Sequence, residues 1–394
     1  MDFQQPARAW CDAILPTLPR QPATAVPAIT TAAAPAGQYS KQQPLSVEVL
    51  ENINLSAAGR ATPIHHLELA LEVADFTLSP GDAVGILADN PPPLVAAILD
   101  GCTLSGEAPV SIDGQSMPLV QALRQHRDLT IASPRFLTFW AALGQSPALR
   151  EQAQAPAPAQ RQFLKQVQVL DLILQAPATP DPQALVDALR PLQPRLYDVA
   201  NSLAAIGDEL HLTVKAYHYP FGTRREQGIA SRYLLALEPG DRLLLYPHRN
   251  ARFHLPEAPQ TPVILIAEGT GIAPYRAFVQ DIGKRGPQRD TWLVFAEQQF
   301  EQDFLYQSEL QQAHASGALT RVDTVFYQDS GETLAAPLIR EQTLLAGWLE
   351  RGAHVYFCGD KARLGDCENA LAALVGADVW KQLGKDKRLH RNLY

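Results

Sequence analysis

The chain has 394 residues, of which 33 are Lys or Arg and 41 are Asp or Glu, which gives a net charge of −8. A chain of this length forms two or three domains, each large enough to bury a core. The acidic balance excludes the basic surface typical of nucleic-acid-binding proteins, and no apolar run approaches the length of about 18 residues that a membrane span needs. We therefore expect neither nucleic acid nor a membrane as a partner.

The four cysteines bear on compartment and metal binding. They are Cys11, Cys102, Cys358 and Cys367, and no two of them stand at the spacing of a metal site. Such cysteines are typical of free thiols in a reducing compartment. We therefore expect a cytoplasmic protein without a metal.

Residues 1–40 predict a short helix followed by a tether. The segment ARAWCDAILPTL, at 7–18, is compatible with one amphipathic helix. The stretch after it is rich in Pro, Ala and Thr, which is typical of a linker between domains. Because a linker joins two parts, we expect the chain to be cut from a longer protein.

From residue 41 the pattern changes to short strands. The segments SVEVLENINL, HHLELALE and DAVGILA alternate or run apolar, and the tripeptide Pro-Gly-Asp marks turns. Helical segments interrupt these strands, which then resume with RLYDVANS and ELHLTVKAYHY. We predict a small antiparallel barrel formed by residues 41–95 and 194–258, with a helical insert at 96–193.

The last part of the chain alternates strand and helix. PVILIAEGTGIAPYRAFVQDI indicates a strand, a glycine loop and a helix, and further apolar strands such as TWLVFAEQ and AHVYFCGD follow. Alternation of this kind implies a parallel sheet. Residues 259–394 are therefore predicted to form a nucleotide-type α/β domain.

Two loops of this domain follow strands and are candidates for binding a ligand. Glycines at the start of a helix let an anion approach free N–H groups, and ligands of open parallel sheets lie beyond the carboxyl ends of strands. A structural turn and a buried thiol remain the alternatives. The candidate contacts in these loops are Gly269, Thr270, Gly271, Cys358, Gly359 and Asp360.

Two motifs of the predicted barrel carry further candidates. In QPRLYD, Arg195 can hold a phosphate and Tyr197 can lie flat on a ring. In QGIAS, small residues precede the hydroxyl of Ser231 at an expected helix start, which suits a second phosphate. A helix cap without a ligand is the alternative there.

The order of these features resembles a known family. A barrel, a helical insert, RLY, GIAS, GTGIAP, CGD and a terminal aromatic follow one another as in the diflavin reductases of the ferredoxin–NADP reductase superfamily. The resemblance covers residues 39–394 and is strongest to the sulfite reductase flavoprotein (alpha) component without its FMN domain. GTGIAPYRAF, FLYQSEL and the closing Arg-x-x-Tyr are its most specific parts. Residues 1–18 resemble the last helix of the missing FMN domain.

The resemblance implies a fold and an activity. The barrel would bind FAD, the α/β domain would bind NADPH or NADH, and hydride would pass from nicotinamide C4 to flavin N5. Electrons would then pass to an FMN domain or flavodoxin-like protein, or to a haem protein such as a sulfite reductase beta subunit. A free flavin or dye as acceptor is a further alternative.

The resemblance also assigns roles to residues. Arg195 would pair with the FAD pyrophosphate, Tyr197 would flank the isoalloxazine, and Tyr394 would cover the other ring face until a nicotinamide displaces it. Further contacts with FAD are expected from Thr213, Tyr219, Gly228, Ala230 and Ser231. Asp366, after the CGD loop, is expected among the nucleotide contacts.

Two positions around the expected flavin N5 depart from the family. The family has Ser where this chain has Asp198, and an acidic residue where this chain has Asn392. With Cys358, these two are the predicted catalytic residues. We expect a compensated exchange that keeps one acid near N5; loss of tuned catalysis is the alternative.

The expected nucleotide pocket departs further. Gln328, Thr333 and Ala335 stand where NADPH-specific relatives have Arg, Lys and Tyr, and Glu268 adds a negative charge to the glycine loop. Without cations a phosphate loses its charge-assisted bonds. NADPH would then bind poorly, be replaced by NADH, or not bind. The alternative function is an FAD-binding subunit that has lost efficient NADPH oxidation and serves assembly or another donor.

Overall fold

The computed structural model describes residues 39–57, 60, 62–71, 73, 76–222 and 224–394. The helix predicted at 7–18 and most of the tether lie outside these residues. Within the described ranges, no helix is both long enough and apolar enough to cross a membrane.

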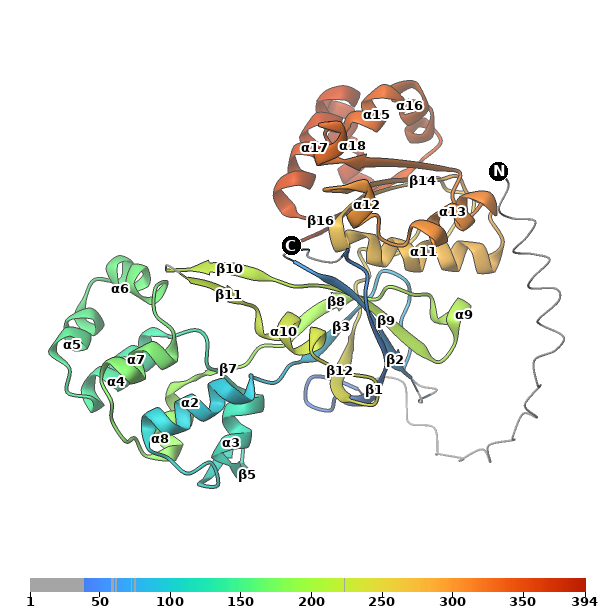
Figure 1. Cartoon of the computed structure of the whole chain (residues 1–394). Helices are drawn as coiled ribbons and strands as arrows, with labels where there is room; N and C mark the ends of the chain where they lie inside the picture. The colour runs from blue at the N-terminus through green and yellow to red at the C-terminus, as the bar shows by residue number, and fades with distance from the viewer. Residues whose placement is uncertain (1–38, 58–59, 61, 72, 74–75, 223) are drawn as a thin grey trace, which may run out of the picture. The chain divides into compact units, whose positions relative to one another are not determined.

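A six-stranded antiparallel sheet forms the predicted barrel (Figure 1). In their order across the sheet, its strands are β8 (Arg195–Asp198), β3 (Ala83–Leu87), β12 (Arg242–His248), β1 (Leu45–Asn54), β2 (Ile64–Ala70) and β9 (Glu209–Lys215). Just beyond β8, Val199 forms a bridge with Leu212 of β9, which brings the two edges of the sheet together.

The alternation of apolar and polar residues in the sequence explains which side chains of β2 face the barrel core. Leu67 and Leu69 are buried in the barrel core, and Leu67 pairs with Leu212 of β9. Successive side chains of a strand point to opposite faces. His66 and Glu68 therefore lie on the other face of the strand, where the His66 ring contacts Tyr306 of the second domain.

Four short elements complete the barrel domain. They are α9 (Leu203–Ile206), α10 (Ile229–Leu235), and the hairpin formed by β10 (His218–Phe221) and β11 (Arg224–Gln227). The hairpin contacts the insert through an ion pair between Arg224 and Asp171 at 2.8 Å.

The insert is mostly helical and has its own core. Its helices are α2 (Pro92–Cys102), α3 (Leu119–Gln121), the π-helical turn η2 (Ala122–His126), α4 (Pro134–Leu143), α5 (Pro147–Gln154), α6 (Ala157–Leu164), α7 (Val169–Gln175) and α8 (Pro182–Ala188). Two small strand pairs accompany them, β4 (Pro109–Ile112) with β5 (Gln115–Pro118), and β6 (Arg127–Asp128) with β7 (Arg190–Pro191). The boundary predicted between residues 95 and 96 falls inside α2.

Local sequence explains where several of these helices begin. Ser133, Ser146 and Asp181 each accept a hydrogen bond from a backbone N–H of the following turn, and each is followed by a proline. A short polar side chain at the cap satisfies a free N–H, and proline suits the first helical position because it has no N–H to satisfy.

The second domain is a five-stranded parallel sheet, as predicted. In their order across the sheet, its strands are β15 (Arg321–Phe326), β14 (Thr291–Glu297), β13 (Val263–Glu268), β16 (His354–Gly359) and β17 (Leu389–Leu393). Its helical elements are η3 (Gly269–Gly271), α11 (Ile272–Arg285), α12 (Phe300–Asp303), α13 (Gln307–Ala315), α14 (Tyr327–Ser330), α15 (Ala336–Arg340), α16 (Gln342–Glu350), α17 (Lys361–Val375) and α18 (Ala377–Lys385).

Helices cover both faces of this sheet (Figure 1). One apolar core joins the sheet to α11 and α13, and a second joins it to α15, α16 and α17. The strand order reverses between β13 and β16, where the chain crosses from one half of the sheet to the other. Ligands of such sheets bind at this switch point, beyond the carboxyl ends of the strands.

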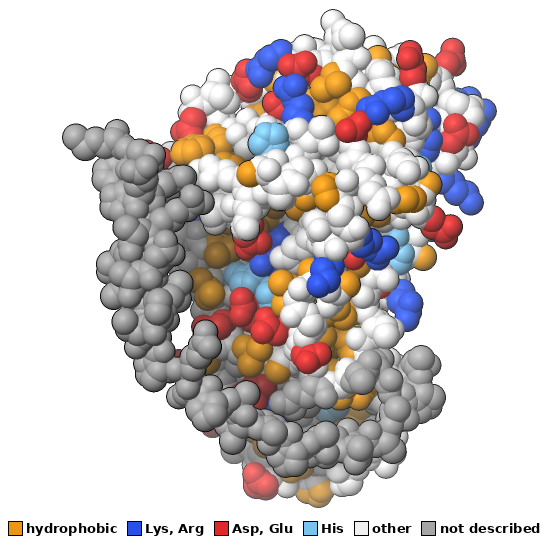
Figure 2. All heavy atoms as spheres, turned by 90° about the vertical axis from the view of Figure 1, so that its right-hand side faces the viewer, with side chains coloured by type: hydrophobic (Ala, Val, Ile, Leu, Met, Phe, Trp, Pro, Cys, Tyr) orange, Lys and Arg blue, Asp and Glu red, His pale blue; other side chains and the backbone are white. Residues whose placement is uncertain are grey.

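The charged side chains of the face shown in Figure 2 are mixed in sign. Over its upper part, Lys and Arg side chains are interspersed with Asp and Glu side chains. Nucleic-acid-binding proteins instead gather basic residues on one face.

Candidate functional site

Asp198, Cys358 and Asn392 lie together where the barrel meets the parallel sheet. Asn392 Nδ2 donates a hydrogen bond to Asp198 Oδ1 at 2.7 Å, and Cys358 Sγ lies 3.8 Å from Asp198 Oδ2. Cys358 and Asn392 are direct partners in the pairing of β16 with β17, so the sheet holds both side chains side by side. Asp198 reaches them from β8.

Burial decides the protonation of this cluster. It raises the pKa of Asp198 to about 6, although the hydrogen bonds from Asn392 and Cys358 act in the opposite direction. Burial and the neighbouring carboxylate raise the pKa of the Cys358 thiol well above its usual value. Cys358 is therefore a neutral thiol at physiological pH, whereas Asp198 changes its charge near pH 6.

The terminal Tyr394 stands beside this cluster with its ring accessible. Its backbone N–H donates to Gly359 O at 3.2 Å, and its hydroxyl lies 3.0 Å from Thr270 Oγ1. The side chain is nevertheless 59% exposed. The ring is thus fixed at its two ends and retains a free face on which a planar group can stack.

The two predicted loops touch through their backbones. A Cβ atom on Gly271 would lie 1.9 Å from Cys358 O, and one on Gly359 would lie 2.3 Å from Glu268 O. Gly359 also has a φ of +132°, which favours glycine. Asp360 caps α17 by accepting from the N–H groups of Ala362 and Arg363. The loops therefore form one surface at the switch point.

The barrel has two predicted phosphate contacts, Arg195 and the turn at Gly228, and they differ in the groups that they offer. Arg195 is exposed, and its guanidinium has no bonding partner among the described residues. Gly228 stands at the cap of α10, with Ala230 and Ser231 in its first turn. The Ser231 hydroxyl accepts from Tyr217 N and donates to Gly228 O, both at 3.1 Å, so the backbone N–H groups of that turn are what a phosphate could use.

The aromatic residues of the barrel include one that the sequence did not single out. Tyr197 is partly buried, and burial raises its pKa. Tyr219 stacks with Tyr217 at a centroid distance of 6.0 Å, and Tyr217 is 62% exposed and packs near Gly228. The alternation of aromatic residues in KAYHY was the signal for Tyr217.

Thr213 and Asp366, also predicted as cofactor contacts, are placed on β9 and α17. The hydroxyl of Thr213 bonds Tyr306 OH at 2.7 Å and so joins the barrel to the second domain. Asp366 is exposed on α17. Their assignment as cofactor contacts stays a prediction.

A buried polar network holds the two domains together around Thr213. Arg276 of α11 donates to Ala200 O at 2.8 Å and to His211 Nδ1 at 3.1 Å, and it pairs with Glu309. The nitrogen and oxygen atoms of His66, Glu68 and His211 lie close enough to suggest a metal site. A metal ion on Nε2 of His211 would leave the proton of the neutral imidazole on Nδ1. Nδ1 could then no longer accept the hydrogen bond from Arg276, so a bound cation would conflict with this contact.

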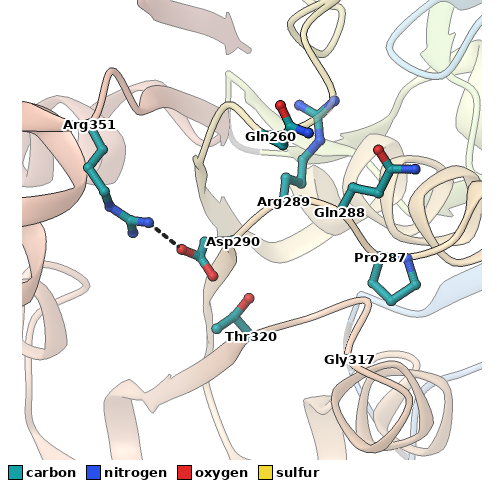
Figure 3. Close-up of a pocket in the computed structure, with 8 residues that line it drawn as sticks. All are labelled: Gln260, Pro287, Gln288, Arg289, Asp290, Gly317, Thr320 and Arg351. Atoms are coloured by element: carbon teal, nitrogen blue, oxygen red, sulfur yellow. Dashed lines mark ion pairs between the residues drawn. The ribbon is translucent and has the colours of Figure 1, made fainter.

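A shallow cavity of about 440 Å³ lies at the opposite edge of the sheet (Figure 3). Its lining residues Asp290 and Thr320 immediately precede β14 and β15 at their amino ends, and Arg351 pairs with Asp290 at 2.7 Å. Because ligands of parallel sheets bind at the carboxyl ends, this cavity is separate from the candidate site.

Comparisons with known proteins match both domains. A family described as FAD binding domain matches residues 37–233, and one described as Oxidoreductase NAD-binding domain matches residues 265–367. The chain is 34% identical over 414 residues to the sulfite reductase [NADPH] flavoprotein alpha-component of Vibrio cholerae serotype O1, with 100% of this chain and 67% of the relative covered.

Similar proteins of two other bacteria give the same result. Those of Shewanella sp. (strain MR-7) and Yersinia pestis, which bear the same name, are each 37% identical, over 385 and 379 residues. The alignments cover 92% and 93% of this chain, and 63% and 62% of the relatives. The chain thus spans about two thirds of the length of the curated relatives it matches.

Proposed function

Because the chain belongs to the family of sulfite reductase flavoprotein alpha-components, we propose that it oxidises NADPH or NADH at a bound FAD and delivers the electrons to a separate acceptor. It is a flavoprotein oxidoreductase with an FAD-binding and an NAD-binding domain. The family, the fold class and the two kinds of cofactor predicted from the sequence are thereby confirmed.

The side chains present fit FAD. The exposed ring of Tyr394 offers a stacking face. Among the described residues, the Arg195 guanidinium has no bonding partner, and the first turn of α10 offers N–H groups that its own helix leaves unpaired. When bound, FAD supplies the conversion of a two-electron hydride donor into a source of single electrons. The protein supplies binding, orientation and the local charge.

The observation that carries the proposal is the cluster of Asp198, Cys358 and Asn392 beside Tyr394. One residue comes from the barrel and the others come from the sheet, so the cluster stands where a group on the barrel would meet a nucleotide on the sheet. Asp198, held by Asn392, would place a negative charge where the nicotinamide becomes cationic as its hydride leaves. Cys358 would contribute shape and a weak donor.

The test of this function is an anaerobic titration with NADPH and with NADH. The absorbance of the purified protein's flavin is expected to bleach with at least one of them. Bleaching by neither would instead favour an FAD-binding subunit without nucleotide oxidation, which the lack of any Lys or Arg between residues 321 and 340 supports. Dithionite reduction serves as the control for an intact flavin.

The binding of FAD gives a separate prediction. Arg195→Ala is expected to weaken FAD binding by about 10- to 150-fold, because a charge-assisted contact with the pyrophosphate is worth about 1.5–3 kcal/mol. Titration of the apoprotein with FAD, followed by flavin fluorescence, measures this. Arg190→Ala, an exposed arginine in the nearby β7, is the control and should bind FAD normally. Equal affinities in all three proteins would exclude this role of Arg195.

The acceptor and the location follow from the same reasoning. We propose an FMN domain or flavodoxin-like protein as the direct acceptor, or a haem protein such as a sulfite reductase beta subunit, since the relatives are named as the flavoprotein alpha-component of sulfite reductase. The described cysteines Cys102, Cys358 and Cys367 are free, which suits the expected cytoplasmic location.

A further inference from the structure

A cation reaches the expected nucleotide pocket from an element that the sequence pattern did not suggest. The loop after β15 has Gln328, Thr333 and Ala335 in place of basic and aromatic residues, and it has no Lys or Arg. Arg363 comes instead from the first turn of α17, beyond β16. It lies at the carboxyl ends of the strands, where nucleotides bind to such sheets.

Two contacts hold the side chain of Arg363. Its Cζ atom lies 4.2 Å from the ring centroid of Tyr327, the first residue of α14, and its Nε lies 3.6 Å from Glu268 Oε1. The side chain is 43% exposed. A guanidinium has five N–H donors, and the ion pair with Glu268 is long, so most of these donors remain available to a ligand.

Tyr327 adds a buried polar group, and its ring lies against this guanidinium. Its hydroxyl is buried and lacks a hydrogen-bond partner among the described residues. Burial raises the pKa of Tyr327 to about 12, so the hydroxyl remains a neutral donor. A buried hydroxyl without a partner is rare in native proteins, and a ligand oxygen would satisfy it.

A nucleotide without the 2′-phosphate has a free ribose diol, which needs a hydrogen-bond acceptor. Glu268 does not offer that acceptor. It is 8% exposed, its Oε1 faces Arg363 and its Oε2 faces Asp360 N at 3.4 Å. Burial also raises its pKa, with Lys215 and Arg363 acting in the opposite direction. The free groups at this end of the site are therefore donors, which suit an anion better than a diol.

We propose that Arg363, stacked on Tyr327, binds the 2′-phosphate of an NADP-type nucleotide in place of the cations that the β15 loop lacks. The proposal rests on the proposed function, because it assumes that a nucleotide binds at the switch point. It makes this chain selective for NADPH through a residue of α17.

The test uses 2′,5′-ADP and 5′-AMP as probes of the FAD-loaded protein, with binding measured by calorimetry. The unchanged protein should bind 2′,5′-ADP at least about tenfold more tightly than 5′-AMP. Arg363→Gln should weaken the binding of 2′,5′-ADP by about 10- to 150-fold, as expected for the loss of a charge-assisted contact. The affinity for 5′-AMP should not change. Tyr327→Phe, which keeps the ring, should weaken 2′,5′-ADP by several-fold.

Arg340→Gln is the matched control. Arg340 is exposed, lies in α15 close to the same loop and pairs with Glu332. The Arg340→Gln protein should bind both probes with the affinities of the unchanged protein. The proposal is overturned if Arg363→Gln weakens both probes equally or neither, or if the unchanged protein prefers 5′-AMP. Selective binding of 2′,5′-ADP without flavin bleaching by either NADPH or NADH would refute the proposed function and leave this proposal standing.

Discussion

Replacing Asp198 by Ala is expected to slow the reduction of the bound flavin by NAD(P)H by about 10²- to 10⁴-fold. Asp198 is the acidic member of the cluster, and its carboxylate is aimed by Asn392 at 2.7 Å. Removal of the carboxylate leaves the amide without its partner and the developing positive charge without compensation. Stopped-flow measurement of flavin absorbance under anaerobic conditions checks this.

The pH dependence distinguishes a catalytic charge from a structural group. Because the pKa of Asp198 is about 6, its carboxyl is charged above pH 6 and neutral below it. The rate of flavin reduction should therefore fall as the pH drops through about 6. In Asp198→Asn the rate should be low and should lack this inflection, since an amide does not titrate there.

The stability of the fold should depend on pH in the direction opposite to that of the flavin reduction rate. A carboxyl whose pKa is raised by burial favours the folded state at low pH, and this contribution is lost as the pH rises from about 4 through about 6. Above that range, Asp198→Asn should stabilise the fold by on the order of 3 kcal/mol, and at pH 4 it should have little effect. A variant that is slower and yet more stable separates catalysis from folding.

Asp281→Asn is a suitable control for these measurements. Asp281 is also buried, but it lies on α11, where it contacts Ser202 and pairs with Arg285. Its reduction rate and pH profile should match those of the unchanged protein. An unaltered rate in Asp198→Ala would remove Asp198 from the chemistry and leave the alternative that tuned catalysis has been lost here.

The sequence predicted those parts of the site that depend on residues close together in the chain. Glycine loops after apolar strands predicted η3 and the loop after β16, because parallel strands bring their carboxyl ends to one edge. The grouping of Asp198, Cys358 and Asn392 came from the family resemblance; the pairing of β16 with β17 explains physically why Cys358 and Asn392 are neighbours, whereas Asp198 joins them from β8 of the barrel.

The parts that it missed depend on contacts between distant segments. Glu268 alone suggested repulsion of a nucleotide, but Arg363 stands beside it in the folded chain. The hydroxyl of Thr213 is used by Tyr306 across the domain contact. Neither pairing leaves a local pattern in the sequence.

One omission had a local signal. The insert was expected to be helical, yet β4 and β5 form a hairpin within it. Asp113 and Gly114, at its turn, both have positive φ, of 50° and 82°. The dipeptide Asp-Gly between short alternating segments is a strong indication of such a turn.

Replacing Gly271 by Ala is expected to destabilise the second domain by about 3 kcal/mol or more and to lower its melting temperature by about 6–12 °C. The φ of Gly271 is −59°, which any residue adopts, so the effect is purely steric. The added Cβ would lie 1.9 Å from Cys358 O and 2.4 Å from Cys358 C. Backbone atoms, unlike the tip of a side chain, cannot turn away.

The strand pairing prevents relief of this clash. Ala267 of β13 pairs with Cys358 of β16, so either loop can move only if the central pair of the sheet separates. Displacement of Cys358 would also remove it from Asp198, and flavin reduction should be lost with stability. Gly347→Ala, within α16, adds a Cβ that has no atom of the described residues within 4 Å, and it should instead stabilise the fold by about 0.5–1 kcal/mol. Thermal unfolding followed by circular dichroism compares the two, and equal melting temperatures would show that the loops do not depend on their contact.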